Sequence, residues 1–387
     1  MSVAAAKQER FHFLDGLRGI ASLMIVFHHA FTAQVIHALA YLKIPFLTYL
    51  FLNFTQSGVD LFFVLSGVVL LRPYLRKERK LKFLDYFWRR IKRIYPPYFF
   101  ALIFAAFVIW VNTAYPTWYN LNGLRVTFSW PETFKELFIV NFDGVYYNLA
   151  WWSLGIELLF YTLVPLIIFI FPSQNKITDK YLVIVITCTL IMNAALQWFF
   201  TEWLQDLYSL TYHAAILGKF LEYPLCFLMG VILATKDFSL RHAWVFMLSG
   251  IVLICASWIY IPDFHDHYIP LLHSGYGLLY AGIVVLAFNL HSFRSLLDTP
   301  LMIWFGERSY SLFLVHFSVF YFMDSLVSHF TPGRTLAYGL ITRGVGVPLA
   351  LFIAMLLFHF VERRQARGLV TGHLFWPWQV RGMHIDK

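Results

Sequence analysis

The strongest constraint on the fold of this chain is a series of long apolar runs along almost its whole length. A helix needs about 20 apolar residues to cross the hydrocarbon of a bilayer, and runs of that length satisfy their backbone hydrogen bonds as helices. Ten runs occur, over residues 17–37, 57–74, 94–113, 149–171, 180–200, 214–235, 242–261, 270–290, 306–329 and 337–361. We therefore predict an all-α, polytopic integral membrane bundle of about ten transmembrane helices.

The composition excludes a soluble protein. Hydrophobic residues make up 59% of the 387 residues and charged residues 13%, compared with about 45–50% and about 25% in soluble proteins. Disordered chains, coiled coils and disulfide scaffolds are excluded as well. We expect one transmembrane domain over 17–363, between a cytoplasmic amino-terminal segment, 1–16, and a cytoplasmic tail, 364–387. The shorter, charged segment 131–143 predicts an interfacial or re-entrant piece.

The net charge of +9 is concentrated in one stretch. Residues 72–93 hold ten Lys and Arg and two acidic residues, which leaves 20 basic and 19 acidic residues elsewhere. Basic loops stay in the cytoplasm, so we predict that this loop and both termini are cytoplasmic. The membrane would be the inner or plasma membrane of a bacterium or an endomembrane of a eukaryote. Because one loop accounts for the charge, nucleic acid is not expected as a partner.

The first apolar run carries ionisable residues that are expensive in lipid and usually mark function. Arg18 and His29 are 11 residues apart, which places them about 20° apart on one helix face and about 16 Å apart along the axis. His28 points about 80° away from Arg18 by the same geometry. His29 is therefore the better candidate to work with the arginine. The alternative is that both histidines are core residues bonded to neighbouring helices.

Arginines near the end of the basic stretch suit an anionic ligand. Arg90 and Arg93 lie three residues apart, on one face of a helix, and guanidinium groups bind phosphate in a bidentate manner. A nucleotide or coenzyme A would fit this place. The alternative is an orientation signal that contacts anionic lipid headgroups.

Other polar residues within the runs have both structural and functional interpretations. Glu157 lies inside an apolar run and must be protonated, paired or in contact with a wet cavity. Ser66, beside Gly67, permits close helix packing or close approach of a ligand. His316 and Tyr310 taken alone are more typical of satisfied core residues, and Glu362 is typical of an ion pair at a helix end.

The sequence predicts no metal site. The remaining histidines, such as His265, His267 and His273, lie in or near predicted loops and form no metal-binding pattern. The cysteines, at 188, 226 and 255, lie in apolar runs without a C-x-x-C motif and are expected to be buried as small hydrophobic residues. No glycine-rich phosphate loop or nucleophile elbow occurs, which favours direct transfer chemistry assisted by a general base.

Six segments in order resemble the acyltransferase 3 family of integral membrane O-acyltransferases. They are Leu14-Asp-Gly-Leu-Arg-Gly-Ile-Ala21 with His29, Gly58-Val-Asp-Leu-Phe-Phe-Val-Leu-Ser-Gly67, Arg89-Arg-Ile-Lys-Arg-Ile-Tyr-Pro96, Trp152-Ser-Leu-Gly-Ile-Glu157 through Tyr161, Gly306 to His316, and Glu362. Together they span about residues 11–363. The family spacing of Arg, ten residues, then His selects Arg18 and His29.

The resemblance implies transfer of an acyl group, with acetyl favoured, from cytoplasmic acyl-CoA to a hydroxyl of a sugar, a glycolipid or a small secondary metabolite. By position, His29 would be the general base and Arg18 its electrostatic partner. Arg90 and Arg93 would hold the CoA phosphates, although Arg89 and Lys92 flank this pair and a shift by one position is open. The remaining matches are assigned to the site with less specific roles, Glu157 to catalysis and Ser66, Tyr310 and His316 to donor binding.

Two other classes of function are compatible with buried polar residues. A transporter or flippase of a lipid-linked or anionic substrate would also need buried Arg, His and Glu, but it would neither need an arginine pair at the same cavity mouth nor consume acyl-CoA. A structural subunit is the less favoured alternative because it would gain nothing from these costly groups.

Overall fold

The computed structural model describes residues 11–78, 80–114, 127–139, 147–171, 178–203, 220–259, 269–330 and 336–363. All regular structure in these residues is helical. The first half contains α1 (His12–Tyr41), α2 (Pro45–Gln56), α3 (Gly58–Leu75), α4 (Phe83–Ala114), α5 (Trp130–Glu136), the 3-10 turn η1 (Leu149–Trp151), α6 (Trp152–Ile170) and α7 (Asp179–Trp203). The second half contains α10 (Pro224–Thr235), α11 (Leu240–Ile259), α12 (Ile269–Asn289), α13 (His291–Leu297), α14 (Pro300–Phe330), α15 (Leu336–Leu357) and the π-helical turn η5 (Phe358–Glu362).

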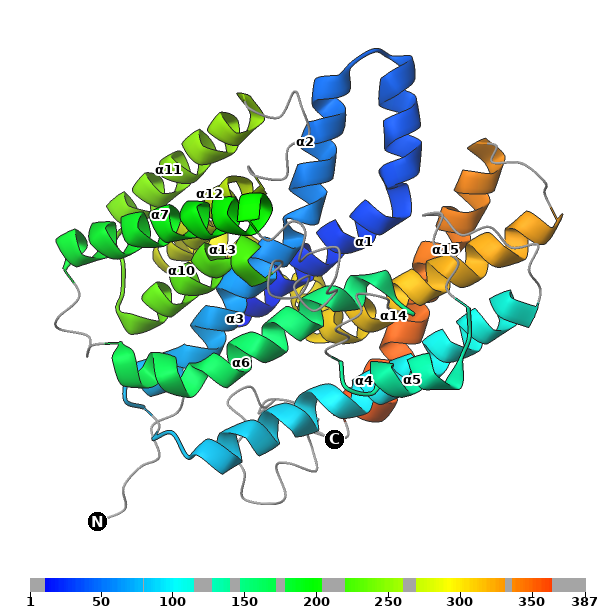
Figure 1. The fold of residues 1–387 in the computed structure, drawn as a ribbon, viewed down its shortest axis with the longest axis horizontal. Helices are drawn as coiled ribbons and strands as arrows, with labels where there is room; N and C mark the ends of the chain where they lie inside the picture. Colours follow the sequence, from blue (N-terminus) through cyan, green and yellow to red (C-terminus); the bar gives the residue numbers. More distant parts are fainter. Residues whose placement is uncertain are drawn as a thin grey trace, which may run out of the picture.

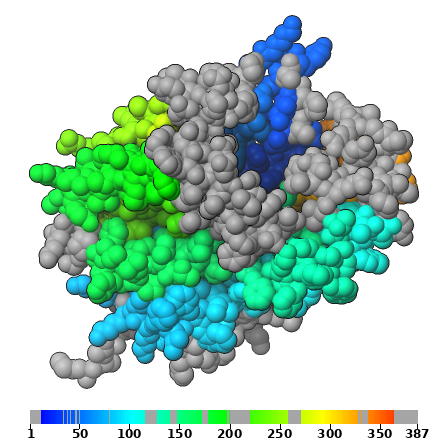
Figure 2. Space-filling model, viewed as in Figure 1, coloured from blue at the N-terminus to red at the C-terminus, as the bar shows by residue number. Residues whose placement is uncertain are grey.

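The helices form a bundle around α1, α3 and α14 (Figure 1). α1 packs along α14, and α14 also packs on α15 and α4. On the other side, α3 packs on α10, and α12 packs on both α10 and α11. Figure 2 shows α7, α6 and α4 on one face of the molecule, while the turn between α1 and α2 stands clear of the bundle. The central position of α1 places its polar residues between the two halves.

The structure confirms an all-α, multi-pass membrane protein. Eight helical segments in the described residues are long and apolar enough to cross a bilayer, and they coincide with eight of the ten predicted runs. The first run lies within α1, which is 30 residues long. The sixth corresponds to α10, a helix of 12 residues; its residues 214–219 lie outside the described part. His265 and His267 also lie outside it.

The predicted basic loop is largely helical, which corrects the sequence interpretation. Its first residues end α3 at Leu75, and α4 begins at Phe83, so the first three turns of α4 precede the predicted run at 94. Arg and Lys have high helix propensity, which explains why the helix extends beyond the apolar stretch. Pro96 and Pro97 lie inside this helix and cannot donate backbone hydrogen bonds.

The structure bears on two further expectations, one for the segment 131–143 and one for the cysteines. The segment 131–143 contains α5, which carries the buried Glu136, and its residues from 140 lie outside the described part. Cys226 is buried as predicted, but Cys188 and Cys255 are exposed on the helix surface. The expectation of burial was wrong for these two because an apolar side chain in a bilayer is equally well solvated by lipid.

Glycines bring the central helices into backbone contact. A Cβ atom on Gly306 of α14 would lie 1.8 Å from the carbonyl oxygen of Asp15, and one on Gly16 would lie 2.2 Å from that of Leu297. A Cβ atom on Gly19 would lie 2.8 Å from the carbonyl oxygen of Met302. Small residues permit this close approach in membrane bundles. The glycines on either side of Arg18 therefore hold α1 against α13 and α14.

We predict that Gly306→Ala destabilises the protein. Its methyl group would meet the backbone of α1, which no side-chain movement relieves, so the cost should reach or exceed the ~1–3 kcal/mol typical of overpacking. The measurement is the thermal unfolding midpoint of the purified protein in detergent. Gly344→Ala is the matched control because a Cβ atom at Gly344 meets nothing within 4 Å. Equal midpoints for the two variants would contradict the close-packing interpretation.

Candidate active site

The structure places Arg18 in a polar cluster between α1, α4 and α6. Asp15, Arg93, Glu157 and Tyr161 all lie within electrostatic range of its guanidinium group. Arg18, Arg93 and Glu157 are each partly exposed although all three lie within apolar helices. Charges in such a place require either counter-charges or a wet cavity. The arginine predicted from the first run therefore meets the arginine and the glutamate predicted from two other segments.

Glu157 is the hydrogen-bonding centre of this cluster. The Ser66 hydroxyl donates to Glu157 Oε1 over 3.0 Å, and the Tyr161 hydroxyl, one helical turn away on α6, donates to the same oxygen. Ser66 lies on α3 beside Gly67, where α3 and α10 are in backbone contact. The sequence prediction that Ser66 and Glu157 belong to one site is thus consistent with a direct contact between them.

Arg90 and Arg93 face this cluster, whereas their neighbours do not. The Arg90 guanidinium lies 5.7 Å from the ring centroid of Tyr86 and 5.5 Å from that of Tyr161. By contrast, Arg89 is buried and donates to the Tyr74 hydroxyl over 3.3 Å, and Lys92 lies over the ring of Trp88. Of these four basic residues, Arg90 and Arg93 therefore lie on the side of α4 that faces the cluster.

Arg90 has capacity for a further ligand. Its Nε atom is buried and has no hydrogen-bond partner among the described residues. A buried donor without a partner costs about 1–3 kcal/mol. An anion bound here would remove that cost, and oxygen acceptors of a phosphate fit the planar donor fork of arginine.

The turn η5, which follows α15, adds a carboxyl group to the cluster. Glu362 in η5 accepts a hydrogen bond from the Ser311 hydroxyl over 2.7 Å, and the charges of Arg18, Arg93 and Arg308 act on it. It is therefore more than the helix-end ion pair considered from the sequence. Tyr310 donates to the backbone carbonyl of Ile94 over 3.0 Å, which ties α14 to α4 immediately after Arg93.

His29 lies in a second cluster, further along α1. Its ring centroid is 5.3 Å from that of His316 and 5.1 Å from that of Phe317, both on α14. The ring makes no hydrogen bond to any residue that the structure describes, and it keeps partial exposure. An imidazole so placed retains both nitrogens for a substrate.

The two neighbouring histidines are engaged differently. His28 is bonded through Nδ1 to the Thr55 hydroxyl over 3.0 Å, so it faces α2 and not α14. His316 is fully buried, and its Nδ1 donates to the Leu312 carbonyl over 3.0 Å. Because a carbonyl only accepts, this bond fixes the proton of neutral His316 on Nδ1 and leaves Nε2 as an acceptor. Nε2 is buried without a partner among the described residues.

The predicted site residues thus form two groups along one face of α1. The first contains Arg18, Ser66, Arg90, Arg93, Glu157 and Tyr310, and the second contains His29 and His316. Arg18 and His29 are separated by three helical turns, about 16 Å. The first group offers positive charge and hydrogen-bond donors, and the second offers an imidazole that can take a proton.

Several buried polar groups lie outside the sequence prediction. Asp60 of α3 is 0% exposed, accepts from Cys226 Sγ over 3.3 Å, and bonds His273 Nδ1 over 2.8 Å. The placement of His273 in or near a loop was wrong, because it lies within α12 and is 5% exposed. Arg343 and Asp324 form a second buried pair. Ionisable residues inside apolar runs were the available signal in each case.

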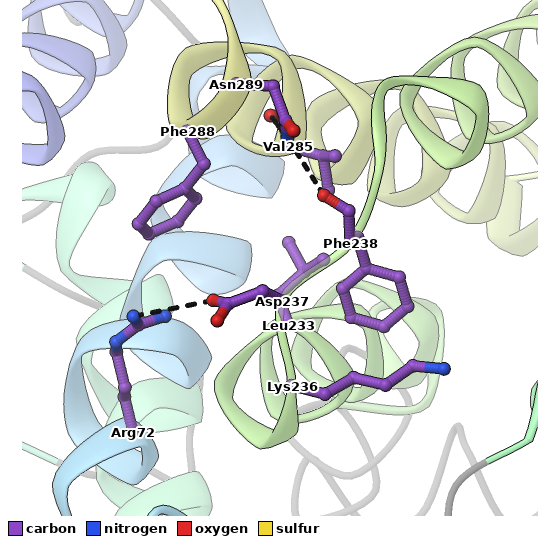
Figure 3. Close-up of a pocket in the computed structure, with 8 residues that line it drawn as sticks. All are labelled: Arg72, Leu233, Lys236, Asp237, Phe238, Val285, Phe288 and Asn289. Atoms are coloured by element: carbon purple, nitrogen blue, oxygen red, sulfur yellow. Dashed lines mark hydrogen bonds and ion pairs between the residues drawn. The ribbon is translucent and has the colours of Figure 1, made fainter.

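A pocket near the ends of α3, α10 and α12 is lined by two basic residues, Arg72 at the beginning of the basic stretch and Lys236 after α10. Figure 3 shows Arg72 and Lys236 on either side of Asp237, with Asn289 above them. Asp237 also accepts two hydrogen bonds from Arg76, of 2.8 and 3.2 Å, and the hydrogen bond from Arg76 lowers the pKa of this carboxyl group. Arg72 and Arg76 therefore hold α3 to the turn after α10.

Among the described residues, no group of three or more His, Cys, Asp or Glu side chains is arranged to hold a metal ion. The polar clusters at Arg18 and at His29 contain side chains for anion binding and proton transfer.

Comparisons with known proteins identify the family. A family model described as an acyltransferase domain matches residues 11–361. The chain is 24% identical over 368 residues to "O-acetyltransferase OatA" of Staphylococcus aureus, an alignment that covers 90% of this chain and 56% of that protein. It is 24% identical over 388 residues to "Peptidoglycan O-acetyltransferase OatA" of Listeria monocytogenes, with 90% and 54% covered.

The chain therefore spans about half the length of the curated relatives it matches. No solved structure matches it. The matched residues run from the start of α1 into η5 and include both polar clusters. This chain thus belongs to the acyltransferase 3 family, and the matched domain contains its membrane-spanning helices.

Proposed function

We propose that the protein transfers an acyl group, with acetyl favoured, from acyl-CoA to a hydroxyl of a carbohydrate, a glycolipid or a small metabolite. The observation that carries the proposal is the alignment of the arginine cluster and His29 along one face of α1. Two relatives are named for O-acetylation, one of them of peptidoglycan, which favours a carbohydrate acceptor. Both termini and the start of α4 would face the cytoplasm.

The donor would bind through its phosphates at Arg90 and Arg93. The unpartnered Nε of Arg90 supports this assignment, as does the placement of both side chains toward the cluster and not toward lipid. Glu157, held by Ser66 and Tyr161, would keep Arg18 oriented. A thioester arm extending from this group along α1 would bring its carbonyl carbon toward His29.

The reaction would then be a direct transfer. His29 takes the proton of the acceptor hydroxyl while the oxygen attacks the thioester carbonyl; the carbon–oxygen bond forms, the carbon–sulfur bond breaks, and the proton passes to the leaving thiolate. General-base assistance of this kind contributes about 10²–10⁴-fold. In neutral His29 one ring nitrogen carries the proton, and the other would act as the base; His316, with its proton fixed on Nδ1 by Leu312, would present no second N–H to that nitrogen.

We predict that His29→Ala reduces acyl transfer by at least ~10²-fold, because it removes the general base. The measurement is transfer of label from radiolabelled acetyl-CoA to a carbohydrate acceptor by purified protein. His28→Ala is the matched control, since it removes an adjacent imidazole that is bonded to Thr55 on another face. Full activity of the His29 variant would refute the assignment, and failure of the wild type to bind acetyl-CoA would favour a transporter.

We predict that Arg90→Ala raises the KM for acetyl-CoA more than it lowers kcat. Loss of a hydrogen bond to a charged group costs about 1.5–3 kcal/mol, so the KM should rise by about 10–100-fold. Lys92→Ala removes the same charge from the same helix, but Lys92 lies over Trp88 and away from the cluster, so its KM should stay within about twofold. Equal effects of the two variants would point to a general surface potential and not to a donor site.

A further inference from the structure

A buried ion pair joins three helices beside His29. Arg343 of α15 and Asp324 of α14 are 4% and 3% exposed. Arg343 Nη1 and Nη2 donate to the two carboxylate oxygens of Asp324, each over 2.8 Å. This bidentate geometry is the strongest form of the arginine–carboxylate contact.

The third donor of the same guanidinium reaches α1. Arg343 Nε donates over 2.8 Å to the backbone carbonyl of Ala30, the residue that follows His29. Ala30 is itself 1% exposed. One planar group therefore fixes the distance between α15, α14 and the turn of α1 that carries the imidazole.

The other side of His29 is connected to the same guanidinium. Arg343 lies 5.3 Å from the ring centroid of Phe320, and the Phe320 ring centroid lies 5.9 Å from that of His316. His316 is in turn the ring neighbour of His29. The backbone next to the imidazole and the ring beside it are thus both in contact with groups that Arg343 orders.

Stability alone does not explain such a pair. Desolvation offsets most of the Coulombic gain of a buried ion pair, and well-packed apolar residues of similar volume are often as stable or more stable. Ionisable groups within membrane spans are rare and usually functional. The hydrogen bonds of Arg343 connect α15 to α14 and α1. Both side chains are too deeply buried to present a face to a ligand.

We propose that the Arg343–Asp324 pair is the positioning device of His29, holding the imidazole in register with His316 and the incoming carbonyl. This inference rests on the proposed role of His29 as the base. A misplacement of about 1 Å can cost ~100-fold in rate. The pair touches neither substrate in this assignment and acts only through Ala30 and Phe320.

Two variants test the proposal. Arg343→Lys keeps the positive charge opposite Asp324 but lacks the planar fork and the Nε donor to Ala30. The double variant Arg343→Met with Asp324→Leu removes both charges together, which avoids an uncompensated buried charge. We expect kcat to fall by about 10–100-fold in both, with the KM for acetyl-CoA within about twofold of wild type. Activity is expressed per acetyl-CoA binding site, so unfolded protein does not count.

Thr342→Ala is the matched control. It removes a buried hydroxyl next to Arg343 that donates locally to the Gly339 carbonyl, and kcat should not change. Wild-type kcat in either test variant while His29→Ala is inactive would overturn the positioning role and leave the proposed function intact. A parallel rise in KM would also overturn it, because that would indicate a general loosening of the bundle. An active His29→Ala protein would instead refute the proposed function.

Discussion

The packing of α1 against α14 is the contact on which the rest of the structure depends. Its closeness comes from glycine, because the backbone of α14 at Gly306 lies against that of α1 at Asp15, and Gly19 leaves room for the Met302 carbonyl of α14. Gly16 leaves room in the same way for the Leu297 carbonyl at the end of α13. With larger residues at these positions the helices would stand apart. Arg18 lies between Gly16 and Gly19, so the same contact that closes the bundle directs this arginine toward α4 and α6, and it brings His29 against His316 and Phe317 three turns later.

Which candidate residues share a helix face could be predicted from the sequence, because this depends only on the short intervals between them along one helix. The 11-residue interval between Arg18 and His29 fixes a shared face on any straight helix, and α1 is continuous through both. Likewise, Arg90 and Arg93, three residues apart, both lie within α4 and therefore on one face of it. The all-helical fold followed from run length alone, since a bilayer leaves few alternatives.

The long-range pairs could not be predicted in the same way. Asp60 and His273 are 213 residues apart in sequence, and Arg343 reaches a carbonyl 313 residues away. Helical periodicity identifies the face on which a residue lies but does not specify which of many helices covers that face. Asp324 and Arg343 are opposite charges in consecutive apolar runs, so their pairing was the one such contact within reach of sequence reasoning. The extent of α4 was missed for a different reason. Hydropathy identifies the part of a helix that lies in lipid, and it gives no signal for a polar continuation of the same helix outside the bilayer.

The two polar clusters differ in the kind of polar group that they contain, and this difference has a physical basis. Arginine, whose charge is permanent at physiological pH, is concentrated where three helices leave room for partial exposure, with Glu157 and Glu362 as counter-charges. The second cluster places imidazoles, which can be neutral at physiological pH, against Phe317. The Arg343–Asp324 ion pair is separated from these imidazoles by Ala30 and Phe320. In the proposed reaction, the apolar surroundings of the second cluster would limit hydrolysis of an acyl thioester, and the charge of the first cluster would attract an anionic donor. Separating the two by three turns of α1 allows one helix to satisfy both requirements, which no single cavity of uniform polarity would do.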